Sequence, residues 1–395
     1  MKYIILLGDG MSDYPIRELG GKTPLQVAKT PNLDFIAREG IVGIVRTIPE
    51  GMDPGSDVGT LSVLGYDPKT YYTGRAPLEA ASIGVNLEPS DVAFRCNLVT
   101  IKNGIMDDYS AGHIKTEDAK KFIEEVNNQL SNDEIKFYPG KSYRHLMVWK
   151  NGKNSLKLTP PHAISGKRVI DYLPKGDGAE KLKELMEKSQ ALFDGSKLNI
   201  IRIEKNEKPV TSIWLWGNGK KPLFKTFKER FGKTGAVISA VDLIKGIAVY
   251  LGFDRIEVPG ATGYLDTNYE GKAEYALKAL KERDFIYLHV EAPDEAGHNG
   301  DLKAKIKAIE DFDAKVVGAV LAGIKEHKKY KVMALPDHPT PLSLRDHSGD
   351  PVPFAIYSSN GKKDGAGSFD EEEAKNGSKR FEEGHKLMEY FLGSD

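Results

Sequence analysis

Carboxylate and imidazole side chains recur in this sequence just after short apolar segments. Oxygen and imidazole nitrogen donors without thiolates suit Mn²⁺, Zn²⁺ or Co²⁺, and Mg²⁺ less well. One such motif alone is weak, but several at the ends of predicted strands together favour a metal site. The side chains are Asp9, Asp294, His298, Asp337, His338 and His347.

The spacing of these residues limits how they share ions. Asp294 and His298 are four residues apart, which lets both reach one ion from a helical turn or a tight loop. Asp337 and His338 are adjacent, so they cannot point the same way on an extended segment. They would serve two neighbouring ions, or one ion from a kinked loop.

A turn of small residues around Ser56 precedes a helical pattern that starts near Asp57. In one interpretation Ser56 is an N-cap and Asp57 complements the helix dipole. In the other, the hydroxyl of Ser56 lies at a helix N-terminus, where backbone amides accept a phosphoryl group. A serine bound to a metal ion loses its proton more readily and becomes a nucleophile. The spacing alone does not separate the two interpretations.

Short apolar runs separated by helical patterns must position these side chains. Runs of this kind alternating with helices predict an α/β fold with a largely parallel sheet. Ligands of such sheets bind beyond the carboxyl ends of the strands, where several of the acidic loops fall. The predicted strands are 3–7, 236–239, 285–290, 331–335 and 352–358.

The middle of the chain has a different pattern, with short strands and charged helices. We predict an inserted α+β domain at 92–202, and a core domain made of 1–91 and 203–395. Within the insert, the segments 94–101, 145–149 and 198–203 are predicted strands, and 116–129 and 177–192 are predicted helices.

Composition excludes several classes of function. The 395 residues carry a net charge of −1, so we expect no nucleic-acid partner. A single cysteine, Cys96, excludes an intramolecular disulfide framework and any multi-cysteine metal site. No apolar stretch approaches the ~20 residues that span a bilayer, and the N-terminal run lacks signal-peptide features. We therefore expect a cytoplasmic protein without a membrane partner, and the sequence predicts no particular oligomeric state.

Taken together, the motifs give the chain a resemblance to the cofactor-independent phosphoglycerate mutases of the archaeal type, in the alkaline phosphatase superfamily. They follow the family order and span nearly the whole chain. They are Gly-Asp-Gly at 8–10, Gly-Ser-Asp-Val-Gly at 55–59, Leu-Gly-Tyr-Asp-Pro at 64–68, Gly-Arg-Ala-Pro at 74–77, Trp-Leu-Trp-Gly at 214–217, Pro-Gly-Ala-Thr-Gly at 259–263, Pro-Asp-Glu-Ala-Gly-His at 293–298, Pro-Asp-His at 336–338 and Asp-His-Ser-Gly-Asp-Pro-Val-Pro at 346–353.

The resemblance implies an alkaline-phosphatase-like, mostly parallel sheet with helices on both faces. It implies that Ser56 is the nucleophile that becomes phosphoserine, and that two divalent ions bind, with Mn²⁺ the usual occupant. The implied ligands are Asp294, His298 and His347 for one ion, and Asp9, Ser56, Asp337 and His338 for the other.

The resemblance also implies that the inserted domain closes over the substrate as a lid and holds the glycerate. Because a phosphorylated carboxylate favours arginine forks, candidates lie in and near the insert. One departure from the family pattern is Ala163, where an acidic residue is expected after Pro-Pro-His. The candidate substrate contacts are Arg75, Asp108, His113, Arg144 and His145.

The function implied is the interconversion of 3-phosphoglycerate and 2-phosphoglycerate through a phosphoserine, without 2,3-bisphosphoglycerate. Alternatives are a metal-dependent phosphatase, or a mutase acting on another phosphorylated metabolite with the same core. A phosphonopyruvate decarboxylase and a non-catalytic metal-binding protein are further alternatives. The decarboxylase would not need a phosphorylatable Ser56, and the intact nucleophile and both ligand sets argue against the binding protein.

Overall fold

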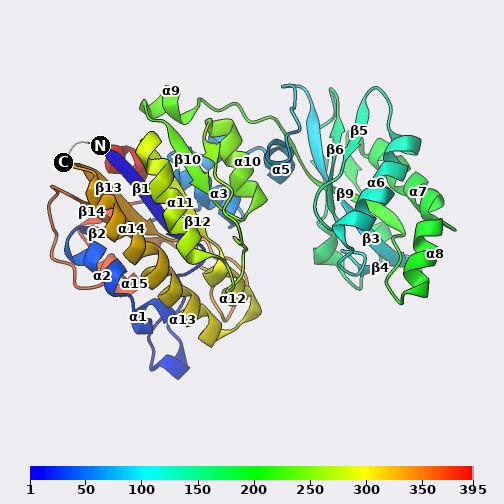
Figure 1. The fold of residues 1–395 in the computed structure, drawn as a ribbon. Helices are drawn as coiled ribbons and strands as arrows, with labels where there is room; N and C mark the ends of the chain where they lie inside the picture. The colour runs from blue at the N-terminus through cyan, green and yellow to red at the C-terminus, as the bar shows by residue number, and fades with distance from the viewer. Residues whose placement is uncertain (394–395) are drawn as a thin grey trace. The chain divides into compact units, whose positions relative to one another are not determined.

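The computed structural model describes residues 1–393, which form two compact units (Figure 1). Unit 1 comprises Met1–Tyr72 and Phe224–Asp395, and unit 2 comprises Thr73–Leu223. The second unit is wider than the insert predicted at 92–202 for two reasons. Helix α5 (Arg75–Ser82) packs Ala76 and Ala80 against its sheet, and strand β9 (Ser212–Lys220) pairs with its central strand.

Unit 1 is built on an eight-stranded sheet in which every strand pair is parallel except those of β14. The three central strands are buried along nearly their whole length, which explains why they appear in the sequence as continuous apolar runs. The strand order is β11 (Asp254–Arg255), β10 (Gly235–Ile238), β12 (Phe285–Val290), β1 (Lys2–Gly8), β13 (Tyr330–Leu335), β14 (Val352–Ser358), β2 (Ile41–Val45) and β15 (Lys379–Phe381).

Helices cover both faces of this sheet (Figure 1). On one face, α2 (Pro31–Arg38) and α11 (Tyr269–Glu282) pack against alternate residues such as Leu6. On the other face lie α3 (Ser56–Val63), α10 (Asp242–Leu251) and α16 (Lys386–Leu392). The predicted α/β fold with a mostly parallel sheet and helices on both faces is confirmed. The short strands β2, β11 and β15 were not predicted.

Unit 2 has a five-stranded antiparallel sheet with helices α6 (Thr116–Leu130) and α7 (Ala179–Phe193) on one face. Helix α5 packs on the opposite face. The strands are β5 (Ile135–Tyr138), β6 (Arg144–Trp149), β3 (Val92–Lys102), β4 (Ile105–Asp108) and β9, and a separate pair joins β7 (Leu156–Lys157) to β8 (Lys175–Gly176).

One predicted strand of the insert, 198–203, is wrong, because the segment forms helix α8 (Lys197–Glu204). The isoleucine-rich run favours a strand by propensity. However, Asn199 and Arg202, three residues apart, form one buried polar side of a helix. Their side chains bond the carbonyls of Phe193, Val210, Lys208 and Ala111, and these tertiary contacts outweigh the propensity.

In the described part of the chain, no helix is both long and apolar enough to cross a membrane.

Candidate active site

The predicted metal ligands gather at the carboxyl-terminal edge of the sheet in unit 1. Asp9 follows β1, Asp337 and His338 follow β13, and Asp294 lies in α12 (Ala292–Asn299), which follows β12. These strands are neighbours in the sheet, so their carboxyl ends meet at one place. His347 reaches the same place from the loop between β13 and β14.

One group of three side chains converges between α12 and the loop after β13. Nε2 of His298 lies 2.9 Å from Nε2 of His347. Oδ2 of Asp294 lies 3.3 Å from Nε2 of His298, and Oδ1 of Asp294 lies 3.4 Å from Nε2 of His347. The other ring nitrogen of each histidine faces a carbonyl, of Arg345 or Pro54, which leaves Nε2 directed at the shared point.

The second group surrounds the hydroxyl of Ser56. Its Oγ lies 3.3 Å from Oδ2 of Asp9 and 3.3 Å from Nε2 of His338. Nε2 of His338 is also 3.5 Å from Oδ1 of Asp9 and 3.6 Å from Oδ2 of Asp337. All four residues assigned to the second ion by resemblance therefore lie together.

Ser56 is the first residue of α3, and Gly55 is its N-cap. The interpretation of Ser56 as the capping residue is therefore wrong, because its hydroxyl points to Asp9 and His338 rather than back to the helix. The hydroxyl thus belongs to the first turn of α3, and a helix N-terminus favours an anionic group. Ser56 is only partly buried, so a substrate can reach it.

Small residues allow the elements of the site to approach closely. Gly10 has a left-handed backbone with φ of 59°, and a Cβ there would lie 2.6 Å from Oδ1 of Asp294. A Cβ at Gly59, on α3, would lie 2.7 Å from the carbonyl oxygen of Asp337. Both positions therefore need glycine, and this explains glycines within the motifs at 8–10 and 55–59.

Two further buried residues contact the ligand groups. His289, at the end of β12, places Nε2 2.9 Å from Oδ2 of Asp9 and Nδ1 3.2 Å from the hydroxyl of Ser239. The Thr340 hydroxyl donates to Oδ1 of Asp294 at 2.5 Å and lies 3.3 Å from Nδ1 of His338. Thr340 thus touches one residue of each ligand group.

Burial and mutual repulsion set the charge state of the carboxylates. Burial, together with the charges of Asp337 and Asp294, raises the pKa of Asp9 well above its usual range. Burial also acts to raise the pKa of Asp294, but hydrogen bonds from His298 and His347 outweigh it and hold this pKa well below its usual range. The same bond to Asp294 raises the pKa of His298 to about 9.

These residues fit divalent cations. Oδ1 of Asp9 and Oδ2 of Asp337 are buried among polar side chains yet have no hydrogen-bond partner, which is costly unless another group binds them. Three buried carboxylates so close together also need positive charge. Three sets of residues each offer metal-ligand atoms that lie within 4.8 Å of one another. The first set is Asp294, His298 and His347, the second is Asp9, His289 and Asp337, and the third is Asp9, Asp294 and His338.

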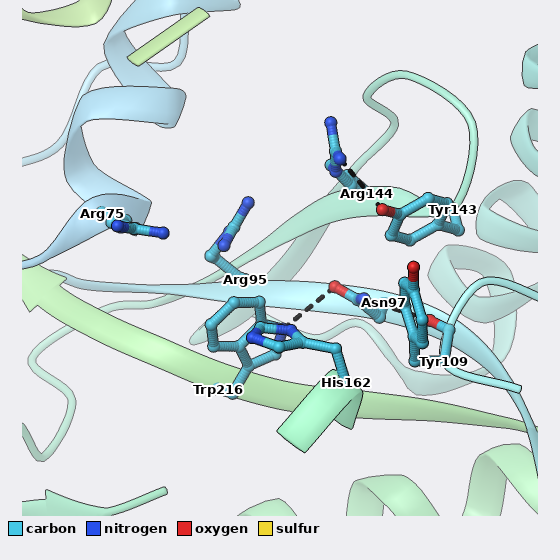
Figure 2. Close-up of a pocket in the computed structure, with 8 residues that line it drawn as sticks. All are labelled: Arg75, Arg95, Asn97, Tyr109, Tyr143, Arg144, His162 and Trp216. Carbon is cyan, nitrogen blue, oxygen red and sulfur yellow. Dashed lines mark hydrogen bonds between the residues drawn. The ribbon is translucent and has the colours of Figure 1, made fainter. Parts of the chain in front are cut away.

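Unit 2 contains a separate polar cavity of about 180 Å³ that is lined by arginines (Figure 2). Arg75 comes from α5, Arg95 from β3 and Arg144 from β6, as Figure 2 shows. The guanidinium of Arg95 lies 4.3 Å above the ring of Trp216 and is fixed by two hydrogen bonds to Glu79. The remaining lining residues are Asn97, Tyr109, Tyr143 and His162.

Of the predicted substrate contacts, Arg75 and Arg144 line this cavity, whereas Asp108, His113 and His145 do not. Asp108 accepts hydrogen bonds from Ser110 and pairs with Lys208. The ring of His113 packs between Tyr109 and Tyr143. Burial lowers the pKa of His145 to about 3, and its Nδ1 accepts a hydrogen bond from the amide of Gly140.

Several residues of the candidate metal site and of the arginine cavity are not predicted from the sequence. Arg95 and Asn97 look like ordinary strand positions in the sequence, and only their alternation with apolar residues on β3 could have indicated a polar face. His289 lies within the apolar run of β12, where the sequence gives no sign of its contact with Asp9. No sequence signal singles out Thr340, because its role depends on the path of a loop.

A serine hydroxyl at a helix N-terminus, among carboxylates and imidazoles that fit two divalent ions, is the arrangement of a metal-dependent phosphoryl-transfer centre. Comparisons with known proteins agree. The family model for 2,3-bisphosphoglycerate-independent phosphoglycerate mutase matches residues 37–199. A probable mutase of this kind from Geobacter sulfurreducens is 55% identical over 99% of this chain and 100% of its own length. One from Methanosarcina acetivorans is 54% identical over 96% of both chains.

Solved structures give the same result. A protein from Pyrococcus horikoshii superposes with a TM-score of 0.85 at 30% identity, covering 100% of this chain and 98% of its own. The cofactor-independent phosphoglycerate mutase from Thermoplasma acidophilum has a TM-score of 0.69 at 28% identity, with full coverage of both chains. This chain belongs to the family of 2,3-bisphosphoglycerate-independent phosphoglycerate mutases.

Proposed function

We propose that this protein interconverts 3-phosphoglycerate and 2-phosphoglycerate through a phosphoserine on Ser56, without 2,3-bisphosphoglycerate. The observation that carries the proposal is the position of the Ser56 hydroxyl, 3.3 Å from both Asp9 and His338 at the start of α3. Its support is membership of a family whose relatives bear this name over their full length.

The reaction needs two phosphoryl transfers in sequence. In the first, Oγ of Ser56 loses its proton and bonds to phosphorus, while the ester bond of the substrate breaks and the glycerate oxygen takes up a proton. In the second, the other hydroxyl of the same glycerate loses its proton and bonds to phosphorus, while the bond between phosphorus and Oγ of Ser56 breaks and Oγ regains its proton. The amides at the start of α3 donate to the phosphoryl oxygens in both transfers.

We propose Mn²⁺ as the occupant of both cation sites. Bound divalent ions lower the pKa of a serine hydroxyl and neutralise charge on phosphoryl oxygens. Around them, His289 fixes Asp9 and Thr340 fixes Asp294, so these carboxylates keep their orientation during the reaction. The proposed ligands are Asp294, His298 and His347 for one ion, and Asp9, Ser56, Asp337 and His338 for the other.

We propose that the arginine cavity of unit 2 binds the anionic groups of phosphoglycerate. The support is that three guanidinium groups, those of Arg75, Arg95 and Arg144, line one cavity. Arg144 is held by the hydroxyl of Tyr143 at 2.9 Å. Asp108, His113 and His145 are not proposed as direct contacts, because they do not line the cavity and contact other residues of unit 2. The predicted lid role of this unit, like the cytoplasmic location, stays a prediction.

The test is one assay on the Mn²⁺-loaded protein with 3-phosphoglycerate and no 2,3-bisphosphoglycerate. Coupling to enolase measures 2-phosphoglycerate, and free phosphate is followed in parallel. We expect rapid 2-phosphoglycerate with little phosphate, because a mutase must keep water from the phosphoserine. Phosphate without 2-phosphoglycerate would make the protein a phosphatase. Neither product would show that another phosphorylated metabolite is the substrate.

A further inference from the structure

A fully buried lysine lies next to the candidate active site without touching its ligands. Lys305 is on α13 (Leu302–Asp311), and its side chain has no exposed surface. Its ammonium donates to the Thr340 carbonyl at 2.7 Å, to Oδ2 of Asp13 at 2.8 Å and to the Ser12 carbonyl at 3.2 Å. Lysines are almost never fully buried unless they are paired, so this position has a specific cause.

The two carbonyl groups belong to the two loops that carry most of the ligands. Ser12 lies three residues after Asp9, and Thr340 lies two residues after His338. The amide of Thr340 also donates to the Ser12 carbonyl, at 3.2 Å. The ammonium of Lys305 therefore joins the loop after β1 to the loop after β13 at the point where they meet.

The backbone position of Thr340 also determines where its hydroxyl lies. Its hydroxyl contacts Asp294 of one ligand group and His338 of the other. A shift of this backbone would move the hydroxyl and change the orientation of both ligands. Changes in such supporting contacts typically weaken metal binding 10- to 100-fold.

Asp13 completes the arrangement and supplies the opposite charge. Its carboxylate accepts from the amide of Leu342, at 3.3 Å and 3.1 Å for its two oxygens, and from the amide of Tyr14 at 2.8 Å. The buried pair of Lys305 and Asp13 is thus bonded to both loops, and each charge has several partners. A buried ion pair of this kind is weak as a stabilising device but specific in the geometry it imposes.

We propose that Lys305 is a positioning residue that sets the spacing of the two ligand-bearing loops and thereby the affinity for the divalent ions. The inference rests on the proposed function, because it assumes that the ligand groups bind metal. Lys305 contacts no ligand side chain, so its effect passes through the backbones of Ser12 and Thr340.

The experiment compares Mn²⁺ binding by three variants, with electron paramagnetic resonance counting free and bound ion. Lys305→Met removes the ammonium and keeps the length of the side chain. The double variant Lys305→Met with Asp13→Asn also removes the carboxylate charge, so it leaves no unpaired buried charge that would destabilise the fold. Lys331→Met is the matched control. Lys331 is also buried and donates to a carbonyl, that of Gly393. It lies at the amino end of β13, whereas Asp337 follows the carboxyl end of that strand.

We expect both Lys305 variants to bind Mn²⁺ about 10- to 100-fold more weakly than the wild type while circular dichroism shows them folded. Lys331→Met is expected to bind Mn²⁺ like the wild type. If the double variant bound Mn²⁺ as tightly as the wild type, the proposal would be overturned. Lys305 would then serve only to balance the charge of Asp13, and not to set the spacing of the loops. Failure of the wild type itself to bind Mn²⁺ would instead overturn the metal centre of the proposed function.

Discussion

The Nε2 atoms of His298 and His347 face each other at 2.9 Å across 49 residues of sequence. Both rings also face the carboxylate of Asp294, which acts to raise the pKa of each histidine. Two imidazole nitrogens this close share either one proton or one cation. Under the proposed function, a divalent ion held by both rings would take the place of a shared proton.

Removal of the metal should therefore lower both activity and stability. We expect a chelator to abolish turnover and to lower the melting temperature, because the carboxylates of Asp9, Asp294 and Asp337 then repel one another. Mn²⁺ at 100 times its dissociation constant adds about 2.7 kcal/mol per site to the free energy of unfolding. Calorimetry with and without Mn²⁺ measures the shift. A stripped protein that keeps its activity and melting temperature would contradict the metal centre.

The change Ser56→Ala should abolish turnover and leave the fold intact, since it removes only the hydroxyl that bonds to phosphorus. The matched control is Ser62→Ala on the same helix, whose buried hydroxyl has no hydrogen-bond partner. We expect the control to keep near wild-type activity. Phosphoserine trapped by acid quenching during turnover should appear in the wild type and in Ser62→Ala only. Full activity of Ser56→Ala would rule out the phosphoserine.

The sequence was most informative for features that a short segment determines by itself, namely the buried strands and the motifs that follow them. The central strands were predicted closely, because burial on both faces requires continuous apolar runs. The candidate metal ligands lie together, as expected, because short-range motifs carry them to the carboxyl ends of parallel strands. The segment 198–203 was predicted wrongly, because the partners of Asn199 and Arg202 lie in other segments of unit 2.

The supporting residues of the site could not be predicted for the same reason. Thr340 contacts Asp294 across 46 residues, and Lys305 contacts Ser12 across 293. Neither residue lies in a local pattern that differs from an ordinary loop or helix. In unit 2, Arg95 lines the cavity together with residues of α5 and β9, which pack beside β3. The predicted boundaries placed both α5 and β9 outside the insert.

The change Arg144→Met should raise the KM for phosphoglycerate more than it lowers kcat. A charged hydrogen bond to an anionic substrate contributes about 1.5–3 kcal/mol, so we expect kcat/KM to fall roughly 10- to 100-fold. Arg144→Lys should recover only part of the loss, because an ammonium lacks the planar fork. Arg168→Met, at an exposed position of the same unit, is the control. Unchanged steady-state constants in Arg144→Met would remove the cavity from the substrate site.

The change Glu371→Gln should stabilise the protein at pH 8 more than at pH 5. Glu371 begins α15 (Glu371–Lys375) and lines a cavity of about 620 Å³ in unit 1. Burial raises its pKa to about 7, although hydrogen bonds from Thr23 and the amide of Asp13 oppose the rise.

The sign follows from proton binding. Between pH 4.5 and 7 the folded protein keeps the proton on Glu371 and the unfolded chain releases it, so this residue makes the free energy of unfolding fall as pH rises. Well above pH 7 this decrease in the free energy of unfolding is complete. A neutral glutamine avoids the decrease and can still accept the hydrogen bond from the Asp13 amide. Urea unfolding at both pH values measures the difference, with the exposed neighbour Glu372→Gln as the control. An equal effect of Glu371→Gln at pH 5 and pH 8 would show that the carboxylate titrates normally in the folded protein.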